Sequence, residues 1–303
     1  MKQIRTILCP VDLSAFSRRE LELAVELARA FGSRLVVQHN LPATGFGMAK
    51  EWEWKQAHPT AGDDGSAEER LAELVSHVPA DVPVESLVTA GPLAVGVARL
   101  AEQLPADLVL LGCHGCSTEE HASLTEDLLG RCNAPILALR ESEDAACSLH
   151  LGEGRLRPLR LLVPTDFSDG AQEAVRYAYG LAEMLPAEVH LLHAIGGSPS
   201  PIRTSDPVGP AVAYREAAKA EAEARLESLV PRAMRERVVL HLKFGTADDA
   251  ILRAAEEVDP DVIVMGEHAR DLVRRFFTRD TARHVLHGAA CPVWFVPPPR
   301  LAA

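Results

Sequence analysis

The sequence lacks three features that would assign it at once to a broad class of proteins. It has no apolar run approaching the roughly 18 residues of a membrane span, and Asp12 interrupts the first apolar stretch too early for a secretory leader. It also lacks an excess of positive charge. The formal net charge is −12, which argues against a non-specific nucleic-acid binder. We therefore expect a cytosolic protein that binds neither membranes nor nucleic acids.

Cysteine is scarce, with 6 residues in a chain of 303. The cysteines stand mostly in or beside apolar runs, which suits reduced core thiols better than a disulfide framework. Cys113 and Cys116 form a CxxC that could be redox-active or bind a metal. No second CxxC accompanies it, so we favour an ordinary strand end. The six positions are Cys9, Cys113, Cys116, Cys132, Cys147 and Cys291.

What the sequence does contain is a domain-sized internal repeat. Pro-Val-Asp-Leu-Ser at residues 10–14 returns as Pro-Thr-Asp-Phe-Ser at residues 164–168, an offset of 154. After His114 the offset becomes 157, so the first copy is three residues shorter between His114 and Pro135. Each copy of roughly 150 residues is long enough for its own core. At the offset of 154, Ala28, Gly91, Asp107, Gly112 and His114 match Ala182, Gly245, Asp261, Gly266 and His268.

Both copies alternate short apolar runs with helical periodicity, which predicts two α/β domains of five strands each. Most of the runs are near-continuous, as in parallel strands buried on both faces. A helical stripe at Leu21, Ala24, Val25 and Ala28 repeats in the second copy, and Ser17 with Glu20 predicts a capping box. The predicted strands are 7–9, 35–37, 84–88, 108–111 and 136–139, then 161–163, 189–192, 238–242, 262–265 and 293–296.

The expected organisation is a first domain at residues 1–141, a polar linker at 142–158 and a second domain at 159–297. Two irregular segments, 42–66 and 196–210, each precede a charged helix. Loops of this length in a compact domain are usually lids or disordered segments.

Open α/β sheets bind ligands beyond the carboxyl ends of their strands, where the strand order reverses. If the first strand lies beside the fourth, this point falls between the turn at residues 10–14 and the turn at Gly112. A carboxylate such as Asp12 can accept a ribose hydroxyl. Glycines that precede a helix can offer main-chain N–H groups to phosphate.

These residues resemble the universal stress protein family. The resemblance covers both copies and rests on motifs in a fixed order: the turn at 10–14, Thr-Ala-Gly-Pro at 89–92, Asp-Leu-Val-Leu-Leu-Gly-Cys-His-Gly at 107–115 and Ala-Pro-Ile-Leu-Ala-Leu at 134–139. It implies a Rossmann-like domain, related to the adenine nucleotide alpha hydrolases and present twice. It also implies that the last strands of the copies pair in an intramolecular pseudo-dimer, and it leaves open a homodimer of the whole chain.

Many members of the family bind ATP through Gly-x2-Gly-x9-Gly-Ser/Thr, and others lack this motif and do not. By resemblance, the first copy would hold ATP with Mg²⁺. The family has nine residues after the second glycine, where this chain has six before Ala122-Ser123. The implied ligands are Pro10, Val11 and Asp12 at ribose or adenine, the Asn40 main chain at the adenine edge, Gly112, His114 and Gly115 at the phosphates, and Ser123, Leu124 and Thr125 at the distal phosphates.

The second copy departs further from the motif. Asp166 and Gly266 remain, but Ala269 replaces the second glycine, and Arg279-Asp280 stand where Gly-Ser belongs. We interpret this copy as a degenerate site in a pseudo-dimer partner. The alternative is an anion or acyl-phosphate ligand held by the arginines of the segment. These are Arg270, Arg274, Arg275 and Arg279.

Three functions from different classes remain open. The first is a nucleotide-binding stress-response module, the second a slow ATPase or adenylating enzyme, and the third a nucleotide-free structural or small-ligand protein. The sequence has no Gly-x4-Gly-Lys-Ser/Thr loop, and no Ser-His-Asp cluster can be assembled by spacing, so we expect at most weak catalysis.

His190 and His193 are three residues apart in a strand. Their side chains should therefore lie on opposite faces of the sheet, and they do not predict a metal site.

Overall fold

A computed structural model describes residues 3–41, 66–113, 123–140, 151, 157–196, 208–267 and 279–299. The chain divides into two compact units, Lys2–Arg155 and Leu156–Ala303, which we call the N-terminal unit and the C-terminal unit. Each unit contains one copy of the sequence repeat.

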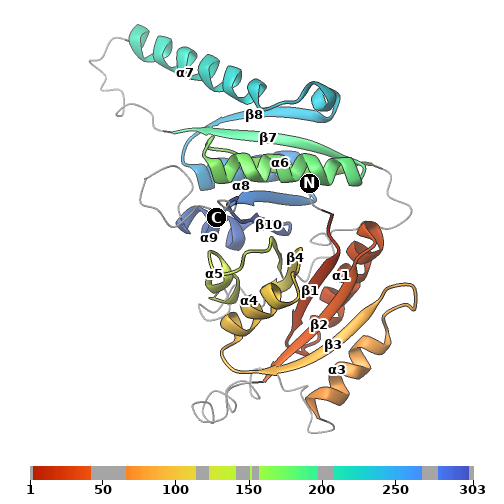
Figure 1. The fold of residues 1–303 in the computed structure, drawn as a ribbon. Coiled ribbons are helices and arrows are strands. Elements are labelled where there is room, and N and C mark those ends of the chain that lie inside the picture. Colours follow the sequence, from red (N-terminus) through yellow and green to blue (C-terminus); the bar gives the residue numbers. More distant parts are fainter. Residues whose placement is uncertain are drawn as a thin grey trace. The chain divides into compact units, whose positions relative to one another are not determined.

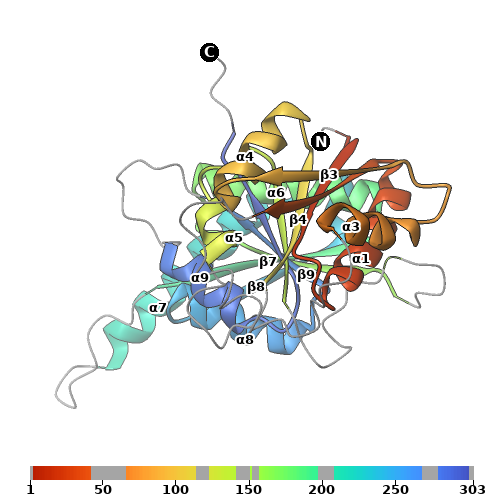
Figure 2. The same cartoon turned by 90° about the horizontal axis from the view of Figure 1, so that it is seen from below.

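In its described residues, the N-terminal unit is a five-stranded parallel sheet with helices on both faces. Its elements are β1 Thr6–Val11, α1 Ser17–Phe31, β2 Arg34–Leu41, α3 Ala67–Ser76, β3 Val84–Ala90, α4 Leu93–Gln103, β4 Leu108–Cys113, α5 Ser123–Leu128 and β5 Ile136–Arg140. The strand order is β3-β2-β1-β4-β5. Helices α1 and α3 lie on one face, and α4 and α5 on the other (Figures 1 and 2).

The C-terminal unit repeats this architecture. Its elements are β6 Leu159–Pro164, α6 Asp169–Met184, β7 Ala187–Ile195, α7 Val208–Ser228, a 3₁₀ helix η2 at Arg232–Arg237, β8 Val238–Phe244, α8 Ala247–Val258, β9 Val262–Gly266, α9 Arg279–Gly288 and β10 Val293–Val296. The strands are parallel in the order β8-β7-β6-β9-β10. Helices α6 and α8 cover opposite faces (Figure 1). The predicted fold class, two five-stranded parallel α/β domains in tandem, is confirmed.

The strands differ in how far their side chains are buried. The central strand β1 is buried along its whole length, whereas β3 and β8 are edge strands with many half-exposed or exposed side chains. Val239 and Phe244 of β8 are 43% and 39% exposed. Strands β3 and β8 therefore depart from the burial on both faces that we expected of most strands.

Asp107 and Asp261, which recur in the sequence, have a structural role in both units. The Oδ2 atom of Asp107 accepts hydrogen bonds from the main-chain N–H groups of Arg5 at 2.9 Å and Thr6 at 3.2 Å. Asp261 Oδ2 likewise accepts from the N–H of Arg160 at 2.8 Å. Each carboxylate thus ties the start of the fourth strand to the start of the first.

The capping box predicted at Ser17 and Glu20 is absent. The residue before α1 is Phe16, which already has helical dihedral angles and makes no side-chain cap. The Ser17 hydroxyl donates instead to Asp12, and Glu20 is buried, with 1% of its surface exposed. The predicted apolar stripe of α1 is confirmed, since Leu21, Ala24, Val25 and Ala28 are all buried.

Helices α3 and α6 begin with side-chain caps. At α3, Ser66 accepts a hydrogen bond from the N–H of Glu69 while the Glu69 carboxylate accepts from the N–H of Ser66, which forms a capping box. At α6, the Ser168 hydroxyl accepts from the N–H of Ala171 at 3.3 Å.

Three of the six cysteines lie in the described residues with their side chains, and all three are buried: Cys9, Cys132 and Cys291. Burial, assisted by the charge of Glu20, raises the pKa of the Cys9 thiol well above its usual value. A raised pKa lowers the thiolate fraction and makes this cysteine unreactive.

Within the described part of the chain, none of the helices is both long and apolar enough to cross a bilayer.

Candidate functional site

The strand order reverses at β1 in the N-terminal unit, because β1 pairs with β2 on one side and with β4 on the other. The carboxyl ends of β1 and β4 flank this reversal, and this is where open α/β sheets bind ligands. Pro10 and Val11, two of the predicted site residues, are buried at the end of β1. The loop that follows them begins with Asp12.

The Asp12 carboxylate is held in one orientation. Its Oδ1 atom accepts hydrogen bonds from the Ser14 N–H and from the Ser17 hydroxyl, both at 2.8 Å. Between these residues, Leu13 has a φ of 62°, a left-handed conformation that is uncommon for a residue with a branched side chain. The loop is thus a strained turn fixed around a carboxylate, an arrangement found preferentially at functional sites.

The same turn occurs in the C-terminal unit. Asp166 Oδ1 accepts from the Ser168 N–H at 2.9 Å, and Phe167 has a φ of 65°. Ser17 has no hydroxyl counterpart here, because the equivalent residue is Ala171. The loop geometry has therefore been kept in both units, although the side chains around it differ.

Strand β2 continues past β1 at this edge of the sheet. The last β1–β2 pair joins Val11 to His39, whereas β2 runs on to Leu41. Asn40 lies in this extension. Its side-chain nitrogen donates to the carbonyl of Gly91 at 2.9 Å, and its side-chain oxygen accepts from the Thr89 hydroxyl at 3.0 Å. The side chain of Asn40 is therefore held against β3, while its main chain lies beyond the last residue of β1.

The C-terminal unit has no equivalent of this amide network. Ala194 stands where Asn40 would be, and Lys243 replaces Thr89. The Lys243 ammonium forms an ion pair with Glu257 of α8. The polar contacts that surround the end of the second strand are thus specific to the N-terminal unit.

Gly112 and Gly266 occupy equivalent places near the ends of β4 and β9, but their surroundings differ. A methyl group on Gly112 would overlap the carboxylate of Glu20 and lie 2.7 Å from Cε1 of Phe16. A methyl group on Gly266 would overlap the main chain of Gly170 at the start of α6. Both glycines are thus required by helix–strand packing, through side chains in one unit and through main chain in the other.

The predicted phosphate-binding residues lie only partly within the described chain. Leu124 and Thr125 are in the first turn of α5, and Thr125 is fully buried. His114, Gly115 and Ala122 lie outside the described residues, as do the side chains of Ser123 and Arg279. The structure thus brings Asp12, Asn40 and Gly112 to one edge of one sheet. Asp166 and Gly266 occupy the same edge in the C-terminal unit.

A histidine contact that lies next to this edge in both units was not predicted from the sequence. His39 Nδ1 lies 2.9 Å from the carbonyl oxygen of Val11, and His193 Nδ1 lies 2.8 Å from that of Thr165. The two histidines are 154 residues apart, so the repeat could have revealed them. Each one ties the second strand to the end of the first. Burial lowers the pKa of His193, which favours its neutral form.

His190 lies on the opposite face of β7 from His193. Its Nδ1 atom is 3.0 Å from Nε2 of His241. The charge of Glu257, on α8, raises the pKa of His241. The charge of Arg225, on α7, lowers the pKa of His193. Within the described ranges, no group of three or more His, Cys, Asp or Glu side chains could hold a metal ion. Cys116 and the side chain of Cys113 lie outside them.

Comparisons with known proteins agree with this architecture. The profile described as the universal stress protein family matches residues 3–140 and again residues 159–297. Universal stress protein MJ0531 of Methanocaldococcus jannaschii is 28% identical over 143 residues, which cover 46% of this chain and 83% of that protein. Universal stress protein G of Salmonella typhimurium is 28% identical over 140 residues, which cover 45% of this chain and 96% of that protein.

A solved structure resembles the whole chain. The universal stress protein from Archaeoglobus fulgidus aligns with 98% of this chain and 97% of its own, at a TM-score of 0.65 and 20% identity. At that identity the likeness concerns the fold. The profile, by contrast, matches most of the sequence in two consecutive stretches. The chain therefore belongs to the universal stress protein family and carries the family's domain twice.

Proposed function

We propose that the N-terminal unit binds an adenine nucleotide at the carboxyl ends of β1 and β4, and that partner proteins in a stress response recognise the bound state. The observation that carries the proposal is the fixed Asp12 carboxylate beside the extension of β2. Asp12 is oriented by two hydrogen bonds of 2.8 Å before any ligand arrives. Preorganisation of this kind lowers the entropic cost of binding.

The extension of β2 suits the edge of an adenine base. Because the Asn40 side chain is engaged by Thr89 and Gly91, recognition at this position would use its main-chain N–H and C=O groups. Asp12 would accept a hydrogen bond from the ribose. The phosphates would then extend toward Gly112 and the start of α5, with His114, Gly115, Ser123, Leu124 and Thr125 completing the site. Mg²⁺ would be carried by the phosphate oxygens of the nucleotide.

One observation favours a second candidate, a universal stress protein that binds a small ligand other than ATP. The buried Glu20 carboxylate packs directly against Gly112, whereas the C-terminal unit has Ala174 at the equivalent position. An ionised carboxylate next to Gly112 would oppose a polyanionic ligand, because electrostatic repulsion is strong away from bulk water.

Calorimetric titration of nucleotide-stripped protein with ATP and Mg²⁺ tests the proposal, combined with mass spectrometry of whatever copurifies before stripping. We expect one ATP per chain. If the titration gives no heat and the preparation contains no bound nucleotide, the proposal is refuted and the second candidate is favoured. Slow ATP hydrolysis is a further alternative, decided by phosphate release from the loaded protein. The cytosolic location, the pseudo-dimer and the homodimer stay predictions.

A further inference from the structure

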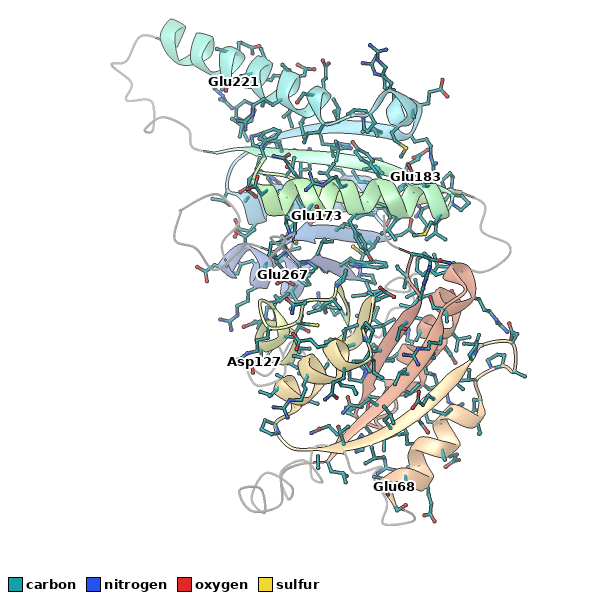
Figure 3. The ribbon with its side chains drawn as sticks, viewed as in Figure 1. Glu68, Asp127, Glu173, Glu183, Glu221 and Glu267 are labelled. Carbon is teal, nitrogen blue, oxygen red and sulfur yellow. The ribbon has the colours of Figure 1, made fainter. Side chains whose placement is uncertain are left out.

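In each unit, an arginine from the helix between the second and third strands contacts the strained loop after the first strand. In the N-terminal unit, Arg70 Nη2 donates a hydrogen bond to the carbonyl oxygen of Leu13 at 3.1 Å. In the C-terminal unit, the guanidinium carbon of Arg225 lies 3.9 Å from the centre of the Phe167 ring. Figure 3 labels Glu68 and Glu221 on α3 and α7, the helices that carry these arginines.

The two arginines are structural equivalents. Arg70 stands one residue before Leu71, and Arg225 one residue before Leu226, and these leucines are buried with 1% and 0% of their surface exposed. The offset between the arginines is 155 rather than 154. The same loop is therefore approached by the same residue type from the same place in the fold.

The contact from Arg70 differs in kind from the other contacts of the loop. The hydrogen bonds that Asp12 accepts from Ser14 and Ser17 join residues at most five positions apart. Arg70 is 57 positions from Leu13 and lies on another helix. Its bond to a carbonyl oxygen is charge-assisted, and such bonds are stronger than those between neutral groups. It holds the one residue of the loop that has a left-handed backbone.

We propose that Arg70 is a positioning residue for the ligand site of the N-terminal unit, an inference that rests on the proposed nucleotide function. By holding the Leu13 carbonyl, Arg70 keeps the turn in its left-handed shape and so keeps the neighbouring Asp12 carboxylate directed at the ligand. Arg70 acts through the loop and does not touch the phosphates.

The test compares Arg70→Ala and Arg70→Lys with two controls. Arg225→Ala removes the equivalent arginine of the other unit, and Arg29→Ala removes a guanidinium of the same unit that is paired with Asp81, on the helix end that is remote from the loop. The probes are adenosine and Mg²⁺-ATP. Adenosine reports on the ribose and base contacts alone, and ATP adds the phosphates.

Arg70→Ala is expected to weaken the binding of adenosine and of ATP by the same factor, at most about tenfold, because a loop that loses one charge-assisted hydrogen bond occupies its ligand-competent shape less often. Arg70→Lys should recover part of the loss, because its ammonium is still a donor. Both controls should bind as the unaltered protein does. Unchanged affinities in Arg70→Ala would overturn the proposal. A loss confined to ATP would also overturn it, because it would mean direct contact with phosphate.

Hydrogen exchange of the main-chain amides of residues 12–16 separates this inference from the proposed function. Exchange should be faster in Arg70→Ala than in Arg29→Ala if Arg70 holds the loop. If the unaltered protein binds neither probe, the nucleotide function fails, and the exchange rates alone decide whether Arg70 holds the turn. Equal rates in the two variants would refute the positioning role whatever the ligand.

Discussion

The Nδ1 atom of His190 lies 3.0 Å from the Nε2 atom of His241. The ring planes are inclined by only 23° and the ring centres are 5.2 Å apart, so the two rings meet nitrogen to nitrogen rather than face to face. The charge of Glu188 raises the pKa of His190 and that of Arg160 lowers it. The charge of Lys243 lowers the pKa of His241 and that of Glu257 raises it. Burial is the main cause that lowers the pKa of both histidines.

This pair should make the C-terminal unit sensitive to acid. As the pH falls below about 6.5, the unfolded chain takes up protons before the folded chain does, because folding lowers both pKa values. The stabilising contribution is complete above that pH and is lost as the pH falls toward the lowered values. Urea midpoints measured between pH 7.5 and 5 should therefore decline less steeply in His190→Gln/His241→Gln than in His77→Gln, an exposed control. Parallel declines would contradict the assignment.

The packing of the two site glycines predicts unequal costs of substitution. Gly266→Ala should be the more damaging, because its methyl group would overlap main chain of Gly170, which cannot rotate away. In Gly112→Ala the overlap is chiefly with the end of the Glu20 side chain. Overpacking typically costs about 1–3 kcal/mol, and we expect Gly266→Ala at or above the upper end.

Adding Glu20→Ala to Gly112→Ala provides the control for this comparison. The second change removes the carboxylate and should recover part of the stability lost in the single variant. Phe16 stays within 2.7 Å of the new methyl group, so the recovery should be incomplete. Chemical denaturation of the three variants measures these differences. No recovery in the double variant would show that Glu20 is not the obstacle.

The two equivalent carboxylates should have different effects on nucleotide binding. Asp12→Ala is expected to weaken ATP by about tenfold or more, the cost of a lost hydrogen bond to a charged group. Asp166→Ala should leave both the affinity and the stoichiometry unchanged, because only the N-terminal unit retains Asn40 and its network. Calorimetry on both variants measures the effects, and equal losses would contradict a single site in the N-terminal unit.

Leu13 and Phe167, the equivalent left-handed residues of the loops after β1 and β6, should respond differently to substitution by glycine. Leu13→Gly relieves backbone strain of about 1–3 kcal/mol, which offsets the greater freedom of glycine in the unfolded chain, so the net change in stability should be small. Phe167→Gly relieves the same strain but removes the ring that contacts His193 and Arg225. It should therefore destabilise the protein. Thermal unfolding compares the two variants, and equal shifts would mean that the Phe167 contacts contribute little.

Much of the fold and part of the site could be predicted from the repeat. The offset of 154 identified Asp12 with Asp166 and Gly112 with Gly266, and the structure places each pair at the same edge of its sheet. His39 and His193 share that offset and could have been found in the same way. Arg70 and Arg225 could not, because one residue is gained between the helix and the next strand in the first copy, which hides the match.

The prediction of a capping box at Ser17 was wrong for a reason that the spacing of Ser17 and Glu20 does not reveal. A Ser-x-x-Glu pattern marks a helix start only where the serine is the capping residue and itself has extended dihedral angles. Phe16 instead has a φ of −73° and a ψ of −27°, so the helical conformation begins earlier. The serine hydroxyl is then available to Asp12, and the glutamate turns inward against β4.

The unlike packing around Gly112 and Gly266 also limits how the two copies could exchange sequence. A recombination that joined the start of α1 to the end of β9 would bring Phe16 and Glu20 toward a strand that approaches main chain at Gly170 in its own unit. The first helix and the fourth strand of each copy are therefore matched to each other, and a chimera that separates them would have to repack this contact.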